Sequence, residues 1–379
     1  MRWLKDTWDC ACRLRKENIP VVAVTAWALL GAYDWNSLLI CSNNHYEPGV
    51  FDIRSEKPRP TALAKQLRTL ATAGQFQHPV LNEKGWWHKN ISSPFIINRE
   101  KIPLLITGCH GTLGKAFRKI CERRAIPYIA LSRQQMDISK PSQIHQAIEL
   151  YKPWGIINTA GYVRVDDAET HSDECFQSNA YGPGTLATLC SETGIRLMTF
   201  STDLVFDGKK QAPYHETDDV NPLNIYGSSK ARGEELIVQA DGSALIIRTS
   251  AFFGPWDRYN FVFHVLETLK QGLPLHVADD VMISPTYVPD LADAALDLFI
   301  DEEKGIWHLS NQGMLTWNEF ALHIADRGGY RNCSIMARPL QEMALKARRP
   351  LYSVLESNKG VKLPLLENAL QRYFEDQYQ

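Results

Sequence analysis

From residue 102 onward, the sequence predicts an α/β fold, a doubly wound parallel sheet with helices on both faces, followed by a smaller lobe. Three observations support this prediction. Short apolar runs, such as "PLLIT" and "YIAL", alternate with helical stretches. A glycine-rich turn directly follows the first apolar run. Helical stretches with only short apolar runs, beginning with "NFVFHVLETLKQGLPL", then make up most of the sequence after residue 250.

The chain has 379 residues, which is too long for one ordinary core, since single domains usually run to about 100–200 residues. We expect three parts: residues 1–75, a linker over 76–101, and a main domain over 102–379 whose substrate-covering lobe lies mainly from 250 onward. The composition, 44% hydrophobic and 22% charged, is that of a globular protein. A net charge of -2 offers no general attraction to nucleic acid or to an anionic membrane.

The eight cysteines are scattered, with no Cys-x-x-Cys pair and no cluster with histidines. We therefore expect reduced thiols in a cytoplasmic protein and no metal site, with His264, His276, His308 and His323 as structural residues. The apolar stretch "IPVVAVTAWALLGAY" is followed by Asp34 and is shorter than the roughly 18–20 residues that a membrane span needs.

Residues 1–75 carry patterns of their own. Helical periodicity predicts helices over residues 1–18 and 61–73, and the run "VVAVTAWALL" predicts a buried strand between them. The residues that follow, 76–101, show no sustained periodicity and predict a linker.

The stretch "GAYDWNSLLICSNNHYEPGVFDIRSEKPRPTALAKQL" resembles the last strand, loop and helix of a glycoside hydrolase barrel of the family-one type. Because such a barrel needs eight strands, the resemblance implies an incomplete (β/α)-barrel remnant. A retaining glycosidase also needs two opposed carboxylates, which in that family lie on earlier strands. Trp27, Trp35 and Glu47 are then former sugar-subsite residues or, in the simpler interpretation, packing residues.

Three glycines, Gly108, Gly111 and Gly114, follow the first strand of the main domain. Glycine is needed at such a turn because the backbone angles are unusual, a side chain would block a pyrophosphate, and the helix must pack close to the strand. The N-terminus of the following helix presents N–H groups to an anion. The spacing predicts a dinucleotide site of the Rossmann type, although a tight strand-to-helix turn without a ligand also uses glycine.

Arg133 directly follows the end of the second strand, where NAD-preferring enzymes usually carry an acidic residue for the ribose 2′-hydroxyl. An arginine at this place would pair with a 2′-phosphate, so we expect a preference for NADP(H). The alternative interpretation is a solvated surface charge.

The fourth strand places Thr202 and Asp203 at its carboxyl end, the edge where ligands bind in open α/β sheets. Tyr226 and Lys230 are four residues apart and share one face of a predicted helix. A neighbouring ammonium lowers the pKa of a phenol, which makes it a better acid–base group, and can hold the nicotinamide ribose. Thr202 would hydrogen-bond the carbonyl oxygen of a substrate. Alone the Tyr-Lys pair is also a common surface pair, but after a glycine cradle it predicts the reduction of a ketone.

A series of motifs from about residue 103 onward resembles the dTDP-4-dehydrorhamnose reductase family, an extended branch of the short-chain dehydrogenases/reductases. The motifs include "TGCHGTLG", "INTAGYVRVDDAE", "FSTDLVFDG", "NPLNIYGSSKARGEE" and "ARRPLYSVLESNK". The resemblance implies reduction of a nucleotide-linked 4-keto-6-deoxysugar by NADPH, with NADH possible, and Thr202, Tyr226 and Lys230 as the catalytic residues. The residues expected around the cofactor are Gly108, Gly111, Thr112, Leu113, Gly114, Arg133, Asp137, Ile138, Ala160, Gly161, Tyr162 and Lys230.

The same resemblance puts Thr202, Asp203 and Ala251 beside the substrate. The family often carries tryptophan at the position of Ala251 and glutamine at that of Val281, so the sugar specificity is less defined than the chemistry.

A homodimer is possible. A non-catalytic alternative is an NADP-binding regulatory subunit similar to the β subunit of methionine adenosyltransferase. A bifunctional hydrolase and reductase is disfavoured because barrel strands are missing, and the three intact catalytic side chains favour the enzyme.

Overall fold

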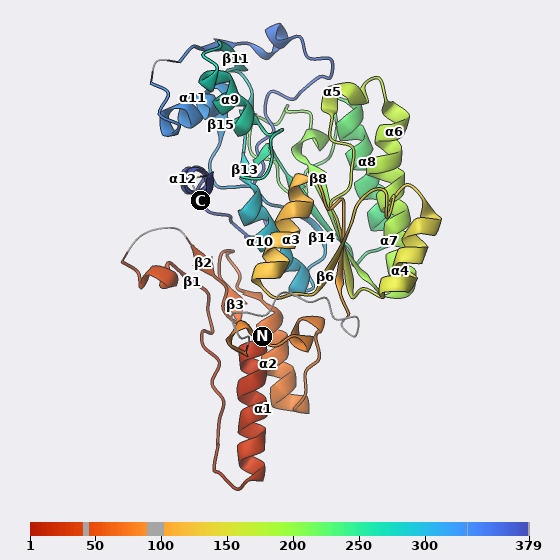
Figure 1. Cartoon of the computed structure of the whole chain (residues 1–379), viewed down its shortest axis with the longest axis vertical. Coiled ribbons are helices and arrows are strands. Elements are labelled where there is room, and N and C mark those ends of the chain that lie inside the picture. The colour runs from red at the N-terminus through yellow and green to blue at the C-terminus, as the bar shows by residue number, and fades with distance from the viewer. Residues whose placement is uncertain (41–44, 89–101, 332, 378–379) are drawn as a thin grey trace.

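The computed structural model describes residues 1–40, 45–88, 102–331 and 333–377 (Figure 1). A six-stranded parallel sheet forms the centre of the main domain, which confirms the predicted α/β class. The strand order is β14-β9-β8-β7-β5-β6. The order in which successive strands are added therefore reverses between β5 and β7, and open sheets of this kind bind ligands at that point. The strands are β5 (Leu104–Thr107), β6 (Tyr128–Leu131), β7 (Gly155–Asn158), β8 (Arg196–Thr202), β9 (Leu245–Thr249) and β14 (Gly305–His308).

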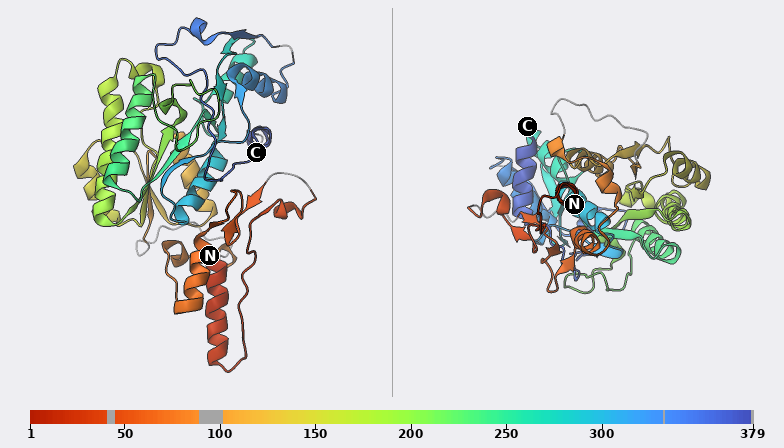
Figure 2. Two further views of the ribbon diagram at one scale, coloured as in Figure 1. Left: turned by 180° about the vertical axis from the view of Figure 1, so that it is seen from behind. Right: turned by 90° about the horizontal axis from the view of Figure 1, so that it is seen from below.

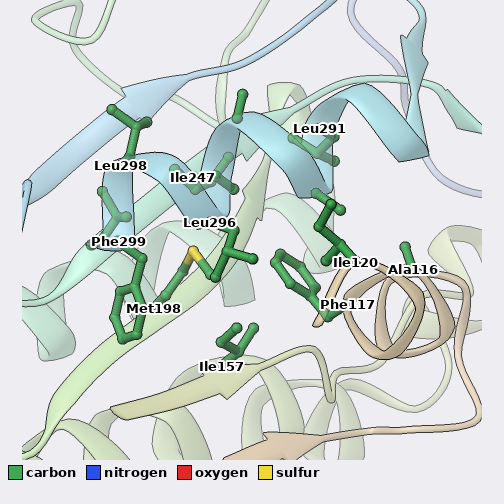
Figure 3. Close-up of a cluster of buried hydrophobic side chains, with 14 of the residues drawn as sticks. Ala116, Phe117, Ile120, Ile157, Met198, Ile247, Leu291, Leu296, Leu298 and Phe299 are labelled. Carbon is green, nitrogen blue, oxygen red and sulfur yellow. The ribbon is translucent and has the colours of Figure 1, made fainter. Parts of the chain in front are cut away.

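Helices cover both faces of this sheet. The first face is covered by α3 (Thr112–Arg123) and α10 (Val288–Ile300), and the second by α4 (Pro141–Tyr151), α7 (Gly182–Thr193) and α8 (Ile225–Ala240). Successive strand residues point to opposite faces. Ile157 and Met198 therefore pack under α3 and α10 (Figure 3), whereas Ile156 and Leu197 pack under the other three helices. Between β7 and α7 lie α5 (Val165–Ala168), α6 (Ser172–Phe176) and a π turn (Gln177–Tyr181).

A smaller lobe follows β9 and has a hydrophobic core of its own. This core contains the aromatic side chains of Phe253, Tyr287, Phe320 and Tyr373. The elements of the lobe are β10 (Phe252–Phe253), α9 (Phe261–Lys270), β11 (Leu275–Ala278), β12 (Met282–Ile283), β13 (Thr286–Tyr287), β15 (Leu315–Thr316), α11 (Trp317–Arg327), β16 (Ile335–Arg338) and α12 (Leu366–Gln377). The chain leaves the lobe to return to the main domain at α10 and β14, and again after β16, where Leu355 packs with Phe206 and Val361 joins the core under α3 and α10.

Residues 1–88 form a separate segment at one end of the molecule (Figure 1). Its helices α1 (Arg2–Lys16) and α2 (Ala62–Ala73) confirm the two helices predicted there. The strands of the segment are β1 (Ala32–Tyr33), β2 (Tyr46–Glu47), β3 (Phe51–Asp52) and β4 (Arg59–Pro60). They form two antiparallel pairs, β1 with β2 and β3 with β4, and parallel pairing in the described part of this segment is limited to an isolated bridge between Leu30 and Phe51.

The buried strand predicted over residues 21–30 is wrong. Residues 21–26 have no regular secondary structure, and the side chains of Val22 and Trp27 are 95% and 84% exposed. An uncharged apolar run becomes a buried strand only where other elements cover it. In the described part of the chain, no such element covers this run.

No helix among the described residues is long and apolar enough to cross a membrane.

The segment packs against the amino-terminal edge of the sheet, at the opposite end from the carboxyl ends of the strands (Figure 2). Val80 joins the core under α3 and α10, and His78 contacts Trp154, which directly precedes β7. The predicted linker therefore begins with packed residues, and its remaining part from residue 89 to 101 lies outside the described residues.

Candidate active site

The turn between β5 and α3 has the shape of a phosphate cradle. Gly108 has φ +65°, and a Cβ on it would lie 2.8 Å from the backbone nitrogen of Ala160. A Cβ on Gly114 would lie 2.4 Å from the Gly108 carbonyl oxygen, so this glycine lets α3 pack close to the turn. A Cβ on Gly111 meets only that same carbonyl oxygen, at 3.3 Å. Packing therefore explains Gly108 and Gly114, whereas Gly111 leaves space in front of the helix, as a bound pyrophosphate requires.

Thr112 and Leu113 form the first turn of α3, next to this space. The first N–H groups of a helix have no partner within the helix and point toward an anion at its N-terminus. Both residues are therefore placed where the sequence predicted cofactor contacts.

Arg133 lies just beyond β6, with an exposed side chain held by two acidic groups. Its Nε is 3.3 Å from Asp137 Oδ2, and one Nη is 3.4 Å from Glu174 Oε1. Asp137 also accepts hydrogen bonds from the backbone and the hydroxyl of Ser139, whose donation lowers its pKa against the opposing effect of burial. Ile138 is buried beside it. The contacts of Arg133 are long and solvent-exposed, so a 2′-phosphate can replace them at little cost.

The loop after β7, which contains Ala160, Gly161 and Tyr162, is fixed by a residue that the sequence reasoning missed. Asn179 accepts a hydrogen bond from the Tyr162 backbone N–H at 2.8 Å and donates to the Tyr162 carbonyl at 3.0 Å. It also donates to Ser229 Oγ of α8 at 3.1 Å. A Cβ on Gly161 would lie 2.9 Å from Asn179 Oδ1, so the loop needs glycine there. The only sign of this clamp in the sequence is an asparagine inside the small-residue stretch "SNAYGPGTLA".

Thr202, Tyr226 and Lys230 come together at the carboxyl end of β8. Thr202 is the last residue of β8, and its hydroxyl donates to Asp203 Oδ1 at 3.1 Å. It is near enough to Tyr226 to oppose the rise in the pKa of that phenol. Tyr226 lies in the first turn of α8, where Asn224 caps the helix by accepting from the Gly227 N–H at 2.7 Å. Lys230 follows one turn later, with its Nζ 6.0 Å from the centre of the Tyr226 ring.

The pKa values of Tyr226 and Lys230 suit Tyr226 as a proton donor. Burial, followed by the charge of Asp203, raises the pKa of Tyr226 above its ordinary value. Burial also lowers the pKa of Lys230 to about 8. The expectation that Lys230 lowers the pKa of Tyr226 is therefore not met in the structure, where Lys230 Nζ donates to the Phe200 carbonyl at 3.2 Å. Tyr226 keeps its proton at neutral pH and has it available for transfer.

Asp203 and Ala251 lie where the sheet meets the lobe. Asp203 is buried and accepts a hydrogen bond from Ser250 Oγ at 3.0 Å, and Ser353 is near enough to lower its pKa against the effect of burial. Burial raises its pKa. Ala251, which directly follows Ser250, has φ +38° and packs against the core of the lobe. Asp203 thus joins β8 to two segments of the lobe, and direct contact of either residue with a substrate stays a prediction.

Of the four histidines expected to be structural, His308 has the surroundings of one, whereas His264 and His323 are exposed. His308 is buried, with its Nδ1 3.0 Å from the carbonyl oxygens of Tyr214 and Glu356, and burial lowers its pKa to about 4. Among the described residues, no group of three or more histidine, cysteine, aspartate or glutamate side chains is arranged to hold a metal ion.

Comparisons with known proteins match the main domain. The family described as "RmlD substrate binding domain" matches residues 102–378. The spore coat polysaccharide biosynthesis protein SpsK of Bacillus subtilis is 34% identical over 277 residues, which cover 72% of this chain and 97% of that protein. The dTDP-4-dehydrorhamnose reductase of Aggregatibacter actinomycetemcomitans is 34% identical over 268 residues, covering 68% of this chain and 91% of that protein.

Solved structures agree. The dTDP-4-dehydrorhamnose reductase of Bacillus anthracis, crystallised with NADP, superposes with a TM-score of 0.69 at 31% identity and covers 73% of this chain and 99% of its own. A dTDP-4-dehydrorhamnose reductase from Clostridium acetobutylicum gives a TM-score of 0.70 at 29% identity, over 73% and 100% of the two chains. The fold agrees with these matches, and the chain belongs to the dTDP-4-dehydrorhamnose reductase family.

Proposed function

We propose that this protein uses NADPH to reduce the 4-keto group of a nucleotide-linked 4-keto-6-deoxysugar, a reaction of the type that converts dTDP-4-dehydrorhamnose to dTDP-rhamnose. The observation that carries the proposal is the meeting of Thr202, Tyr226 and Lys230 at the sheet edge that also holds the glycine cradle. The names of the relatives, most of them dTDP-4-dehydrorhamnose reductases, support the substrate class.

Each residue of the cluster has one task in this reaction. The cofactor supplies the hydride to the carbonyl carbon. The hydroxyls of Thr202 and Tyr226 hold the carbonyl oxygen, on which negative charge develops, and Tyr226 gives it a proton. Lys230, charged below a pH of about 8, would hold the ribose of the nicotinamide. The Asn179 clamp keeps the loop of Tyr162 in place against the cofactor.

The cofactor preference rests on Arg133, which would exchange its two long carboxylate contacts for a 2′-phosphate. NADH remains usable, because the glycine cradle holds the pyrophosphate that both cofactors share. We place the sugar beside Thr202, Asp203 and Ala251, and a homodimer stays possible. The cysteines in the described part of the chain are free thiols, which fits the expected cytoplasmic location.

The likeness of residues 1–75 to the end of a glycoside hydrolase barrel stays a prediction. The position of α2 after the "KPRP" stretch fits it, and the exposed run over residues 21–30 does not supply the barrel strand. We propose no hydrolase activity for this segment.

NADPH oxidation with a panel of keto-sugar nucleotides tests the function. The panel varies the base and the configuration of the sugar, starting with dTDP-4-dehydrorhamnose. We expect turnover of at least one member at saturating cofactor. A protein that binds NADPH and reduces none of them would favour the regulatory alternative, which the intact Thr202, Tyr226 and Lys230 now disfavour.

A further inference from the structure

The amino-terminal edge of the main sheet forms an interface with residues 1–88 (Figures 1 and 2), at the opposite edge of the sheet from the catalytic cluster. We call residues 1–88 the docking module and residues 102–379 the reductase domain. The reductase side of the interface consists of the loop from Asp301 to Glu303, between α10 and β14, and the end of α3.

A charge network with little exposure to solvent joins the two parts. One Nη of Arg59 lies 2.7 Å from Asp301 Oδ2 and 3.1 Å from Glu303 Oε1, and the other lies 3.2 Å from Asp52 Oδ2. The side chains of Arg59 and Asp301 are only 12% and 8% exposed. Removing one partner of such a pair would leave the other buried and unpaired, so the contact between the two parts depends on both.

The same carboxylate also holds a helix of the module. Asp301 Oδ1 accepts from the backbone N–H of Ala62, the first residue of α2, at 2.6 Å. An anion at this position also interacts favourably with the helix dipole. Asp301 therefore binds both the β3–β4 pair, through Arg59, and the helix α2 that follows it.

A second anchor lies at the end of α3. Arg2 donates to the carbonyl oxygens of Arg124 and Ala125 at 2.7 and 2.9 Å, and to that of Val80 within the module at 2.8 Å. Close packing accompanies these contacts, since a Cβ on Gly360 would lie 1.9 Å from the Cβ of Ser55.

The reductase domain is complete without the module. The match to SpsK covers 97% of that protein with 72% of this chain, and the Bacillus anthracis structure is covered to 99% with 73% of this chain. Those proteins therefore have little chain left for a counterpart of the module. The interface has the features of one between partners: buried charges, satisfied carbonyls and an apolar contact at Val80.

We propose that the docking module binds the reductase domain as a partner of its own, through Arg59 and Arg2, and does not depend on the connecting chain to stay in place. Because the interface is at the far edge of the sheet, the bound module leaves the catalytic edge open.

The test cuts the connection in the full-length protein. A protease recognition sequence is inserted between residues 92 and 93, the purified protein is cleaved, and size-exclusion chromatography at micromolar concentration separates free from bound fragments. We expect the two fragments to elute together, with an unchanged rate of NADPH oxidation. Fragments that elute separately would overturn the proposal.

Two variants test the named contacts. Arg59→Met keeps the apolar stem and removes the charge, and Arg2→Met removes the bonds to the end of α3. Each should raise the dissociation constant of the cleaved module at least about 30-fold, as truncating one partner of a buried charged contact does. Lys5→Ala is the control, because Lys5 pairs with Asp9 on the exposed side of α1 and should leave the constant unchanged.

Circular dichroism of the uncleaved variants verifies that both parts stay folded. If both methionine variants are folded and retain the module as tightly as Lys5→Ala, the assigned contacts do not hold it and the proposal fails.

Discussion

The side-chain amide of Asn179 holds the backbone of Tyr162 by two hydrogen bonds, accepting from its N–H at 2.8 Å and donating to its carbonyl at 3.0 Å. Through this pair, the π turn before α7 fixes the loop after β7, beside Lys230. The two residues belong to different segments of the chain. The position of the loop therefore depends on one side chain that is distant in sequence.

Replacing Asn179 by alanine should weaken NADPH binding more than it slows the chemical step. The change leaves the polar backbone of Tyr162 unpaired in a buried place, which costs about 1–3 kcal/mol. We expect KM for NADPH to rise about tenfold or more, and thermal unfolding to occur at a lower temperature. Asn221→Ala is the control, because the side chain of Asn221 is exposed and bonds only Asp207 among the contacts described. Equal kinetics of the two variants would contradict a clamp.

Arg133→Ala should reduce the preference for NADPH over NADH. The guanidinium is expected to pair with the 2′-phosphate, and a hydrogen bond to a charged group is worth about 1.5–3 kcal/mol. The ratio of dissociation constants for the two cofactors should therefore fall by roughly tenfold or more, and binding titrations measure it. Arg232→Ala is the matched control, since Arg232 is an exposed arginine paired with Glu235 on α8. An unchanged ratio in Arg133→Ala would mean that this arginine is only a surface charge.

The activity should fall as the pH rises through about 8. Burial lowers the pKa of Lys230 to about 8, so its ammonium is present below this pH and is lost above it. Without the charge, the contact of Lys230 with the ribose of the nicotinamide loses its charge-assisted strength. A profile of kcat/KM against pH reports the pKa of the free enzyme. A decline that begins only above pH 10, near the ordinary pKa of lysine, would contradict this account.

The local parts of the fold and of the site could be predicted from the sequence. The turn from β5 into α3 and the helix carrying Tyr226 and Lys230 are defined by neighbouring residues, because glycine spacing and helical periodicity act over a few positions. The contact of Asn179 with Tyr162 and that of Arg59 with Asp301 could not be predicted. These contacts join residues that are close only after folding, and they leave no periodic pattern in the sequence.

Two expectations failed for physical reasons. The uncharged run around Val22 predicted a buried strand, but burial depends on a covering layer that a local pattern does not reveal. The pKa of Tyr226 was expected to be lowered by Lys230, but burial raises it and the charge of Asp203 adds to the rise. A spacing of four residues places two side chains on one face of a helix and says nothing about their desolvation.

The protein should hydrolyse no aryl glucoside. The segment of residues 1–75 forms two short antiparallel strand pairs in its described part, which cannot present two carboxylates across a glycosidic bond as barrel strands do. Release of nitrophenol from an aryl glucoside, measured at high protein concentration, checks this. Hydrolysis that disappears when the segment is deleted would contradict the expectation.

The proposed chemistry depends most on the hydroxyl of Tyr226. Tyr226→Phe removes the proton donor and keeps the ring, so the cofactor pocket should hold its shape. General acid catalysis is worth about 10²–10⁴-fold in rate, which is large compared with any packing effect of one hydroxyl. Lys230→Ala should instead weaken both cofactor binding and turnover, because the ammonium serves both.

The most direct measurement is therefore the rate of NADPH oxidation by Tyr226→Phe at saturating cofactor, with dTDP-4-dehydrorhamnose or another member of the panel that the wild type reduces. We predict that the rate falls by at least about 100-fold, as expected for the loss of a general acid, while the dissociation constant for NADPH stays close to that of the wild type. A variant that keeps most of the wild-type rate would show that the Tyr226 and Lys230 pair is structural, and would contradict the proposed mechanism.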